Sequence, residues 1–345
     1  MKKSWLKPGL ALIITLAMLL SVGCNNGAEK KGEQEGVKEK KVVLKLAGAL
    51  PVTHYLSAAM DDMVKKVNEK SNGSIEIQFY PAGQLHTDKT MNDAILTGGI
   101  DIGLNSTAMW ASVIPAMEIF DVPFLFPSYE KVKNVIDGGV GDLLNNEMEK
   151  IGVKALIWAD YGFVQYANNV RPIKTPADFK GLKIRGYGEL PSETIKALGA
   201  APVTMSSGEM YMAVQRRTID GLTSGTPAMY ERKMHEVNKY LTITNHAFPE
   251  FLVAMNLESF NELSDAQKKV LEDVAAEITE EIRAKTKAED ERNLKLLQDN
   301  GMEVYVVPAE EIGKWVTATE SVADIYIKRT GEIGQKIYDL CKSIK

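Results

Sequence analysis

The segment KGLKIRGYGEL, residues 180–190, places Arg185 at the end of a short apolar strand and directly before Gly-Tyr-Gly. A guanidinium is costly to place where a strand runs into a crevice. Arg185 is therefore either solvated or met there by an anion. Tyr187 either closes one wall of such a site or packs against its own domain.

Other polar and aromatic residues follow predicted strands at their ends, where open α/β sheets bind ligands. They are Asn105, Ser106 and Thr107, Trp158 with Tyr161, and Ser224 with Thr226. Taken singly, each is typical of an ordinary loop, because Ser, Thr and Asn are common in turns. Together with Arg185 they point to one crevice. His54 follows the first predicted strand and either meets a polar ligand group or bonds to loop backbone.

The sequence lacks the common catalytic motifs. The four histidines, at 54, 86, 235 and 246, do not have the spacing of a zinc site. The sequence has no Gly-x-Ser-x-Gly elbow and no Walker-type loop. We therefore predict no enzyme, no metal and no cofactor. The alternatives are an extracytoplasmic enzyme that uses Asp160 or Glu209 as acid or base, and a sensory protein that presents its ligand to a receptor.

The N-terminal segment has the pattern of a secretory signal, with lysines before an apolar run at 10–20 that is too short to span a membrane. Leu20-Ser21-Val22-Gly23-Cys24 is similar to a bacterial lipobox, with Ser21 where leucine is usual. We predict that residues 1–24 are a lipoprotein signal peptide ending at a lipidated Cys24, with an ordinary cleavage site or an uncleaved anchor as alternatives. The protein would then be periplasmic or on the cell surface.

Composition limits the partners. Residues 25–41 are Gly, Lys, Glu and Gln with little to bury, which predicts a flexible linker. The whole chain is 45% hydrophobic and 25% charged, as in soluble globular proteins. The part after residue 41 is long enough for two domains. With a net charge of −5 and no basic stripe, no nucleic-acid partner is predicted, and a small solute is favoured. If Cys24 is lipidated, Cys341 has no disulfide partner.

From Val42 onward predicted strands and helices alternate, which favours a mainly parallel sheet covered on both faces. Predicted strands lie at 42–46, 75–79, 100–104, 151–159, 182–185, 201–205, 218–222, 240–244, 251–255 and 302–307, and predicted helices include 88–96, 129–150 and 228–237. Crossings near Asp160 and Glu250 divide the chain into a discontinuous domain I, 42–160 plus 250–345, and an inserted domain II, 161–249. A capping box at Ser264 starts a helix on the order of 50 Å long that reaches Asn300.

Four segments carry a family resemblance. They are YPAGQL at 80–85, DFKGLKIR at 178–185, LGAAPV at 198–203 and IDG at 219–221. From Val42 to the C-terminus the chain resembles the solute-binding proteins of TRAP transporters, the DctP-like family. The resemblance implies an α/β, two-lobed periplasmic-binding-protein-like fold (type II) with hinge strands and a long helix spanning both lobes. It also implies capture of a small organic acid by hinge closure, and delivery to the small and large membrane subunits of an ion-driven permease.

The resemblance also implies residue roles. Arg185 would grip the ligand carboxylate, for which its planar fork is suited, and Gly186 would let backbone approach the ligand. Members that bind sialic acid or C4-dicarboxylates commonly have a second arginine after Gly-Phe, where this chain has Val164 and Gln165, and many members have an asparagine where it has Ser224. These departures, with aromatic candidates for the walls, favour a monocarboxylate. The predicted ligand-binding residues are Arg185, Tyr187, Asn105, Ser106, Thr107, Trp158, Tyr161, Gln165, Ser224, Thr226, Phe248 and His54.

Overall fold

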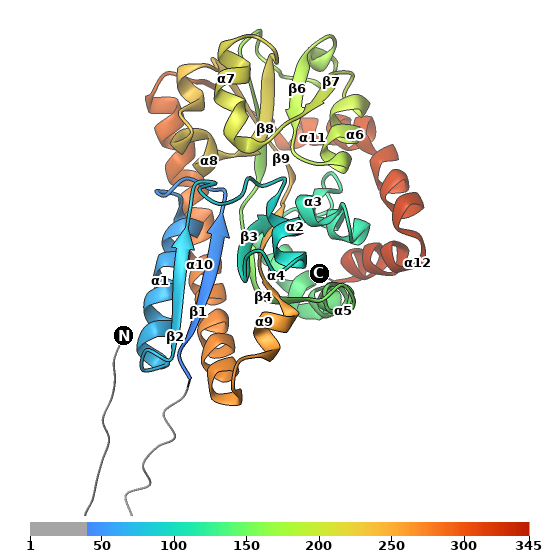
Figure 1. The fold of residues 1–345 in the computed structure, drawn as a ribbon. Coiled ribbons are helices and arrows are strands. Elements are labelled where there is room, and N and C mark those ends of the chain that lie inside the picture. Colours follow the sequence, from blue (N-terminus) through green and yellow to red (C-terminus); the bar gives the residue numbers. More distant parts are fainter. Residues whose placement is uncertain (1–39, 345) are drawn as a thin grey trace, which may run out of the picture. The chain divides into compact units, whose positions relative to one another are not determined.

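The computed structural model describes residues 40–344. The predicted signal peptide, the lipidated Cys24 and the linker up to residue 39 lie outside the described residues. The predicted alternation of strands and helices builds two sheets (Figure 1), with strand orders β2-β1-β3-β10-β4 and β11-β9-β5-β8-β6-β7. We call the first sheet with its helices the first lobe, and the second sheet with its helices the second lobe.

The first lobe is buried on both faces of its sheet. Its strands are β1 (Val42–Gly48), β2 (Ile75–Tyr80), β3 (Ile102–Ser106), β4 (Val153–Asp160) and β10 (Glu250–Asn256), with helices α1 (Tyr55–Lys70), α2 (Met91–Leu96), α3 (Thr107–Trp110), α4 (Tyr129–Val135), α5 (Gly141–Lys150) and α9 (Leu257–Asn261). Along β10, Leu252 and Ala254 pack into one hydrophobic cluster, and Val253 and Met255 into another. This two-sided burial explains why the sequence of β10 is apolar throughout.

The second lobe follows the same plan. Its strands are β5 (Val164–Asn168), β6 (Lys183–Gly186), β7 (Ala201–Thr204), β8 (Gly221–Gly225), β9 (Tyr240–Ala247) and β11 (Glu303–Val306), with helices α6 (Glu189–Ala197), α7 (Met210–Gln215), α8 (Thr226–Glu231) and α11 (Ile312–Thr319).

One helix predicted in the first lobe is divided. The stretch 129–150 is interrupted at Gly139, whose φ of 109° is unsuited to a helix.

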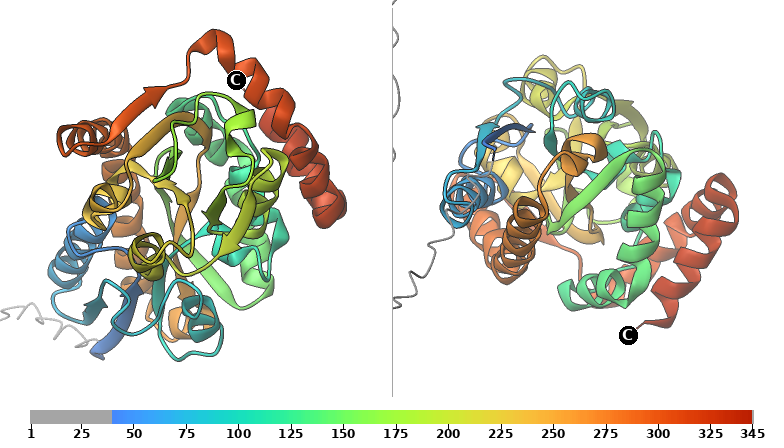
Figure 2. Two further views of the ribbon diagram at one scale, coloured as in Figure 1. Left: turned by 90° about the horizontal axis from the view of Figure 1, so that it is seen from above. Right: turned by 60° about the horizontal axis from the view of Figure 1, so that its bottom comes forward.

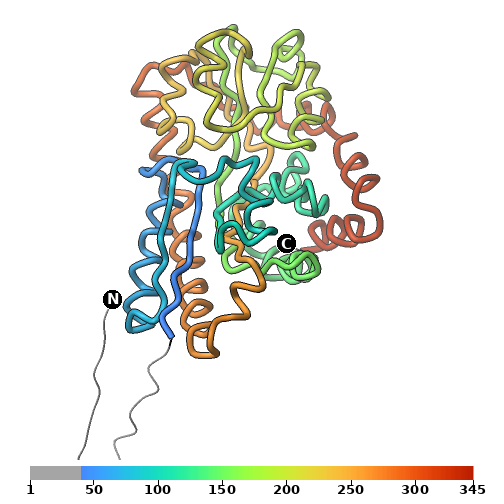
Figure 3. Tube along the Cα trace, in the orientation of Figure 1, coloured from blue at the N-terminus to red at the C-terminus, as the bar shows by residue number. Residues whose placement is uncertain are grey.

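Both sheets are mixed rather than mainly parallel as predicted. Among the described strands, every antiparallel pairing is made by β5 or β10, whereas β1, β2 and β3, and likewise β6, β7 and β8, pair in parallel. The reason lies in the crossings, which the trace in Figure 3 follows between the two sheets. The chain passes from β4 to β5 and from β9 to β10 through short connections, so each new strand runs against its neighbours.

The C-terminal part departs from the predicted domain division in one respect. β11 pairs with β9 in the second sheet, although residues 250–345 were assigned wholly to domain I. The chain reaches that sheet because the preceding helix runs along both lobes. The division itself stays a prediction, since the described residues form one compact unit.

The predicted long helix is confirmed as α10 (Asp265–Asp299), which begins with a capping box between Ser264 and Gln267. It packs against α1 and β4 in the first lobe and against α8 in the second. The last helix, α12 (Ser321–Ser343), returns to the first lobe and lies on the other side of the sheets from α10 (Figure 2). Among the described residues, no helix combines the length and apolar character needed to cross a membrane.

Candidate functional site

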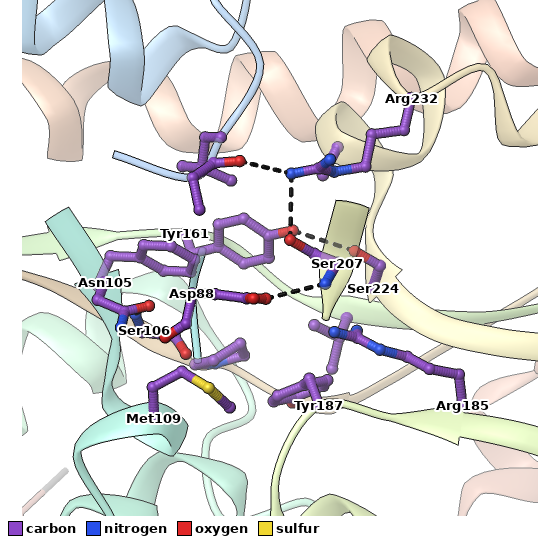
Figure 4. Close-up of a pocket in the computed structure, with 16 residues that line it drawn as sticks. Asp88, Asn105, Ser106, Met109, Tyr161, Arg185, Tyr187, Ser207, Ser224 and Arg232 are labelled. Atoms are coloured by element: carbon purple, nitrogen blue, oxygen red, sulfur yellow. Dashed lines mark hydrogen bonds between the residues drawn. The ribbon is translucent and has the colours of Figure 1, made fainter. Parts of the chain in front are cut away.

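A cavity lies between the two lobes (Figure 4) and has about 550 Å³ of space free of protein atoms, including solvent at its mouth. Its walls come from strand ends and short loops of both sheets, as expected for open α/β folds. The lining residues are Ala49, Leu50, Asp88, Asn105, Ser106, Met109, Tyr161, Val164, Arg185, Tyr187, Ser207, Ser224, Ala228, Arg232, Pro249 and Phe251.

Arg185 stands at the end of β6 and is only 3% exposed. Its Nε and Nη2 donate to the carbonyl of Met205 at 3.3 and 3.2 Å, and its Nη1 donates to the carbonyl of Thr223 at 3.5 Å. An arginine has five N–H donors, so two are left for another acceptor. Within the described residues no carboxylate forms an ion pair with it. Burial lowers the pKa of Arg185 to about 10, so it stays charged at neutral pH.

Arg232 is a second cation in the cavity, which the sequence analysis missed. It lies just after α8, and its Nη2 donates to the carbonyl of Ala49 at 2.8 Å and to Ser207 Oγ at 3.2 Å. Its Nε is buried without a hydrogen-bond partner. The predicted helix at 228–237 ends early, since Lys233 adopts a left-handed φ of 58°, and Arg232 at that end faces the cavity.

Asp88 is the one acidic residue among the described residues that line the cavity, and it too was missed. Its Oδ1 accepts a hydrogen bond from Ser206 Oγ at 2.5 Å, and its Oδ2 accepts one from Ser207 N at 2.9 Å. Burial alone would raise the pKa of Asp88, but these bonds and the charge of Arg185 hold it below the usual value. The sequence placed Asp88 in a helix, whereas α2 begins only at Met91.

Six of the predicted ligand-binding residues line this cavity: Arg185, Tyr187, Asn105, Ser106, Tyr161 and Ser224. Asn105 Nδ2 donates to the carbonyl of Asp88 and to Asn92 Oδ1, both at 2.8 Å, which fixes the loop that carries Asp88. The hydroxyls of Tyr161 and Ser224 lie 3.1 Å apart. Tyr187 lines the cavity, and its hydroxyl donates across to Asp121 Oδ1 of the first lobe at 2.7 Å.

The other six predicted residues do not line the cavity: Thr107, Trp158, Gln165, Thr226, Phe248 and His54. Trp158 and Phe248 belong to a hydrophobic core cluster, and Trp158 Nε1 donates to Asn145 at 3.0 Å. Gln165 Oε1 accepts from the backbone N–H groups of Thr244 and Asn245. Gln165 points away from the cavity because successive strand residues point to opposite sides, and its neighbour Val164 lines the cavity.

Three of these six are held by backbone or core contacts. Thr226 Oγ1 donates to the carbonyl of Asp290 at 2.9 Å, and Thr107 is fully buried at the start of α3. His54 caps α1, its Nδ1 accepting from Leu56 N at 3.2 Å, and its ring stacks on Tyr161. Burial lowers the pKa of His54 to about 3, so the ring is neutral at neutral pH. The backbone-bonded alternative for His54 therefore describes its contacts.

At Gly186 the structure shows a packing constraint. A Cβ at this position would lie 2.8 Å from Ser192 Oγ, so the glycine is needed where α6 packs on β6. Close approach matters instead at Gly225, where a Cβ would lie 2.8 Å from the Tyr161 ring. The missing side chain at Gly225 thus makes room for a cavity wall.

A second group of buried charges lies where the lobes join, outside the cavity. Asp160 and Glu250 are register partners at the ends of β4 and β10, and they are 2% and 0% exposed. Both carboxyl oxygens of Glu250 are buried without a donor. Burial raises the pKa of Asp160 to about 6 and that of Glu250 well above its usual value. Arg283 Nε lies 3.8 Å from Asp160 Oδ1.

Asp290 of α10 completes this group, which we call the hinge cluster (Asp160, Glu250 and Asp290). Its Oδ2 accepts from Tyr129 OH at 2.7 Å and from Phe163 N at 3.1 Å. Burial raises the pKa of Asp290 to about 7. Neither Asp160 nor Glu209, the two acids considered for an enzyme, lines the cavity. Glu209 instead caps a short helical turn by accepting from Ser206 N.

With this geometry in place, comparison with known proteins is decisive. Residues 46–329 match the family model of the bacterial extracellular solute-binding proteins, family 7, known as DctP. The chain belongs to this family. The resemblance seen in the sequence is therefore confirmed, and so is the two-lobed α/β fold. Members of the family are periplasmic solute-binding receptors of TRAP transporters, which agrees with the predicted compartment.

Among curated relatives, the C4-dicarboxylate-binding periplasmic protein DctP of Rhodobacter capsulatus is 31% identical over 278 residues, covering 80% of this chain and 82% of that protein. The 2,3-diketo-L-gulonate-binding periplasmic protein YiaO of Escherichia coli is 30% identical over 252 residues, covering 73% and 76%. These names cover both dicarboxylates and a sugar acid. The family alone therefore does not identify the solute.

Solved structures give the same picture. A TRAP solute-binding protein from Sulfurospirillum deleyianum with bound succinate has a TM-score of 0.84 and 27% identity, and covers 89% of this chain and 100% of that one. The sugar-acid-binding protein DctPAm from Advenella mimigardefordensis, in complex with galactonate, has a TM-score of 0.85 and 25% identity, covering 88% and 99%.

Proposed function

We propose that this chain, a solute-binding protein of a TRAP transporter, captures a small monocarboxylate in the cavity between its lobes and holds it through Arg185. The observation that carries this proposal is the buried Arg185 guanidinium, which has two N–H groups without a protein acceptor and no carboxylate partner among the described residues. A buried cation of this kind is stable when an anion meets it.

Both lobes contribute to the site, which supports binding by closure. Arg185 and Ser224 come from the second lobe, while Asn105 and Ser106 come from the first. A ligand that touches both sides favours the closed form, because it gains contacts there that the open form lacks. The solute is then presented to the membrane subunits of the permease.

The body of the ligand is argued from the walls. Leu50, Val164, Ala228 and Phe251 are apolar, while Asn105, Ser106, Ser207 and Ser224 offer hydrogen bonds. A short acid with an apolar backbone and a keto or hydroxyl group would use both kinds of wall.

The test is a thermal-shift screen of organic acids on the wild-type protein and on Arg185→Met. A bound acid should raise the melting temperature of the wild type by mass action. Loss of two charge-assisted bonds, each on the order of 1.5 to 3 kcal/mol, should reduce affinity by roughly a hundredfold or more in Arg185→Met. Calorimetry that finds equal affinity for the two proteins would refute the role of Arg185. Recovery of a chemically altered ligand would instead support the enzyme alternative.

The lipid anchor is a separate proposal, which concerns residues outside the described part of the chain. If Cys24 carries lipid, labelled fatty acid fed to cells should appear in the wild-type protein and not in Cys24→Ser. Equal labelling of both proteins, or of neither, would contradict it.

A further inference from the structure

The charges that line the cavity do not cancel. Among the described residues of its wall, Arg185 and Arg232 are cationic and Asp88 is anionic, which leaves a net charge of one positive unit. The two tyrosines, Tyr161 and Tyr187, are neutral, because burial raises the pKa of each hydroxyl. Glu231, which also interacts with Arg232, does not line this cavity.

Asp88 interacts with both arginines, since its charge acts on Arg185 and on Arg232. In Figure 4 its carboxylate points toward Ser207, on the side of the cavity from which both guanidinium groups enter. Hydrogen bonds to Ser206 and Ser207 hold it there, so it cannot easily turn away when a ligand arrives. The protein thus supplies one carboxylate to this pair of arginines itself.

We propose that Asp88 is a specificity-determining residue, which cancels one of the two cavity arginines so that the site accepts a monoanionic acid and rejects the matching dianion. This inference rests on the proposed function, in which Arg185 binds a carboxylate. The arginine absent after Gly-Phe does not suffice as an argument for a monocarboxylate, because Arg232 brings a second cation from another element. The preference for one carboxylate over two therefore depends on Asp88, whose charge would repel a second ligand carboxylate at close range in a site of low dielectric.

The experiment uses Asp88→Asn, which keeps the size and much of the hydrogen bonding of the side chain and removes its charge. The probes are acids that differ in one carboxylate: galactonate against galactarate, and 4-hydroxybutyrate against succinate. Affinities are measured by calorimetry near neutral pH. The wild type should prefer the monoanion of each pair that binds, and Asp88→Asn should move the ratio toward the dianion by about tenfold or more.

A matched control separates charge from lobe closure, because Asp88 also links the lobes. Ser206→Ala removes one of the two hydrogen bonds by which Asp88 links the lobes, keeps the charge of Asp88, and changes no residue of the cavity wall. It should keep the wild-type ratio even if both affinities fall. In Arg232→Met, where the cavity has no net charge, both members of a pair should bind more weakly.

The outcomes are distinguishable. A wild type that prefers dianions, or an unchanged ratio in Asp88→Asn, would overturn the role of Asp88 while leaving acid binding intact. A ratio that moves equally in Ser206→Ala would show that closure, not charge, sets the preference, and would also overturn it. A wild type that responds to no carboxylate in the screen would instead refute the proposed function, and this inference with it.

Discussion

The cavity and the hinge cluster both bury charge, but with opposite sign and with different consequences. The cavity buries Arg185 and half-buries Arg232, whereas the hinge cluster buries Asp160, Glu250 and Asp290. Burial lowers the pKa of Arg185 only to about 10, so this group stays charged near neutral pH. Burial raises the pKa of Asp160 to about 6 and that of Asp290 to about 7, so these groups can become neutral by taking up a proton.

This difference teaches which buried charges point to a ligand. A buried carboxyl group avoids the desolvation cost of its charge by protonation, and therefore needs no cationic partner. A buried arginine has no such route, so it needs an anion from the protein or from outside. The hinge cluster is thus expected to act on stability and its dependence on pH, and the cavity on affinity.

The largest effect is expected at Gly162, beside the hinge cluster, where φ is 91° and a Cβ would overlap the Asp290 carboxylate. Gly162→Ala should lower the free energy of unfolding by about 2 to 5 kcal/mol, from left-handed backbone strain plus overpacking. Denaturant unfolding measures it. Gly152 is the control, since its φ of 78° is similar but no atom lies within 4 Å of a Cβ there. Equal losses in Gly162→Ala and Gly152→Ala would show that the overlap with Asp290 is unimportant.

The next effect is a pH dependence at Glu250, whose folded-state pKa is raised well above its usual value by burial. Below pH 4.5 the group is protonated in both states and costs nothing. As the pH rises, the unfolded chain releases this proton and the folded chain keeps it, so stability falls by about 1.4 kcal/mol per pH unit. Glu250→Gln is neutral at every pH, so it should gain stability relative to the wild type from pH 5 to pH 8.

A matched variant sharpens this prediction. The pKa of Asp290 is raised to about 7, so the relative gain of Asp290→Asn should stop growing near that pH. Urea unfolding at pH 5, 6, 7 and 8 compares the three proteins. His54 and His246, whose pKa burial lowers to about 3, act in the opposite direction in all three and cancel in the differences. Parallel stability curves for wild type and Glu250→Gln would contradict the argument.

Much of the fold could be predicted from sequence because it depends on local patterns. The capping box at Ser264 defined the start of α10, and the turn at Asn300 and Gly301 its end. The two crossings followed from apolar strands with loose loops between them. The antiparallel pairing of β5 and β10 could not be read in this way, since strand direction depends on which sheet the chain enters after a crossing.

The cavity was only half predicted, for a related reason. Arg185 stood out because a charged side chain at the end of an apolar strand is costly unless water or an anion meets it. Asp88 and Arg232 do not stand out in the sequence, because each lies beside other polar residues in a stretch predicted as a helix. Their burial comes from the approach of the other lobe, through Ser206 and Ser207 for Asp88 and through Ala49 for Arg232. The end of α8 at Glu231 and the left-handed Lys233 that follows are visible only in the backbone of the structure.

The smallest expected effect concerns Asp121, a titratable group bonded to the cavity-lining residue Tyr187. Tyr187 OH donates to Asp121 of the first lobe, and burial raises the pKa of Asp121 to about 8. At pH 7 this bond joins two neutral groups, so Tyr187→Phe should weaken ligand binding by about 1 kcal/mol, or roughly fivefold. Above pH 8 Asp121 ionises and the bond becomes charge-assisted, so the loss should roughly double at pH 9. Tyr161→Phe is the control, because its hydroxyl meets Ser224 and no carboxyl group, and its loss should not grow with pH. A pH-independent ratio between wild type and Tyr187→Phe would mean that Asp121 does not change its charge in this range, and the cavity would then differ from the hinge cluster even more sharply.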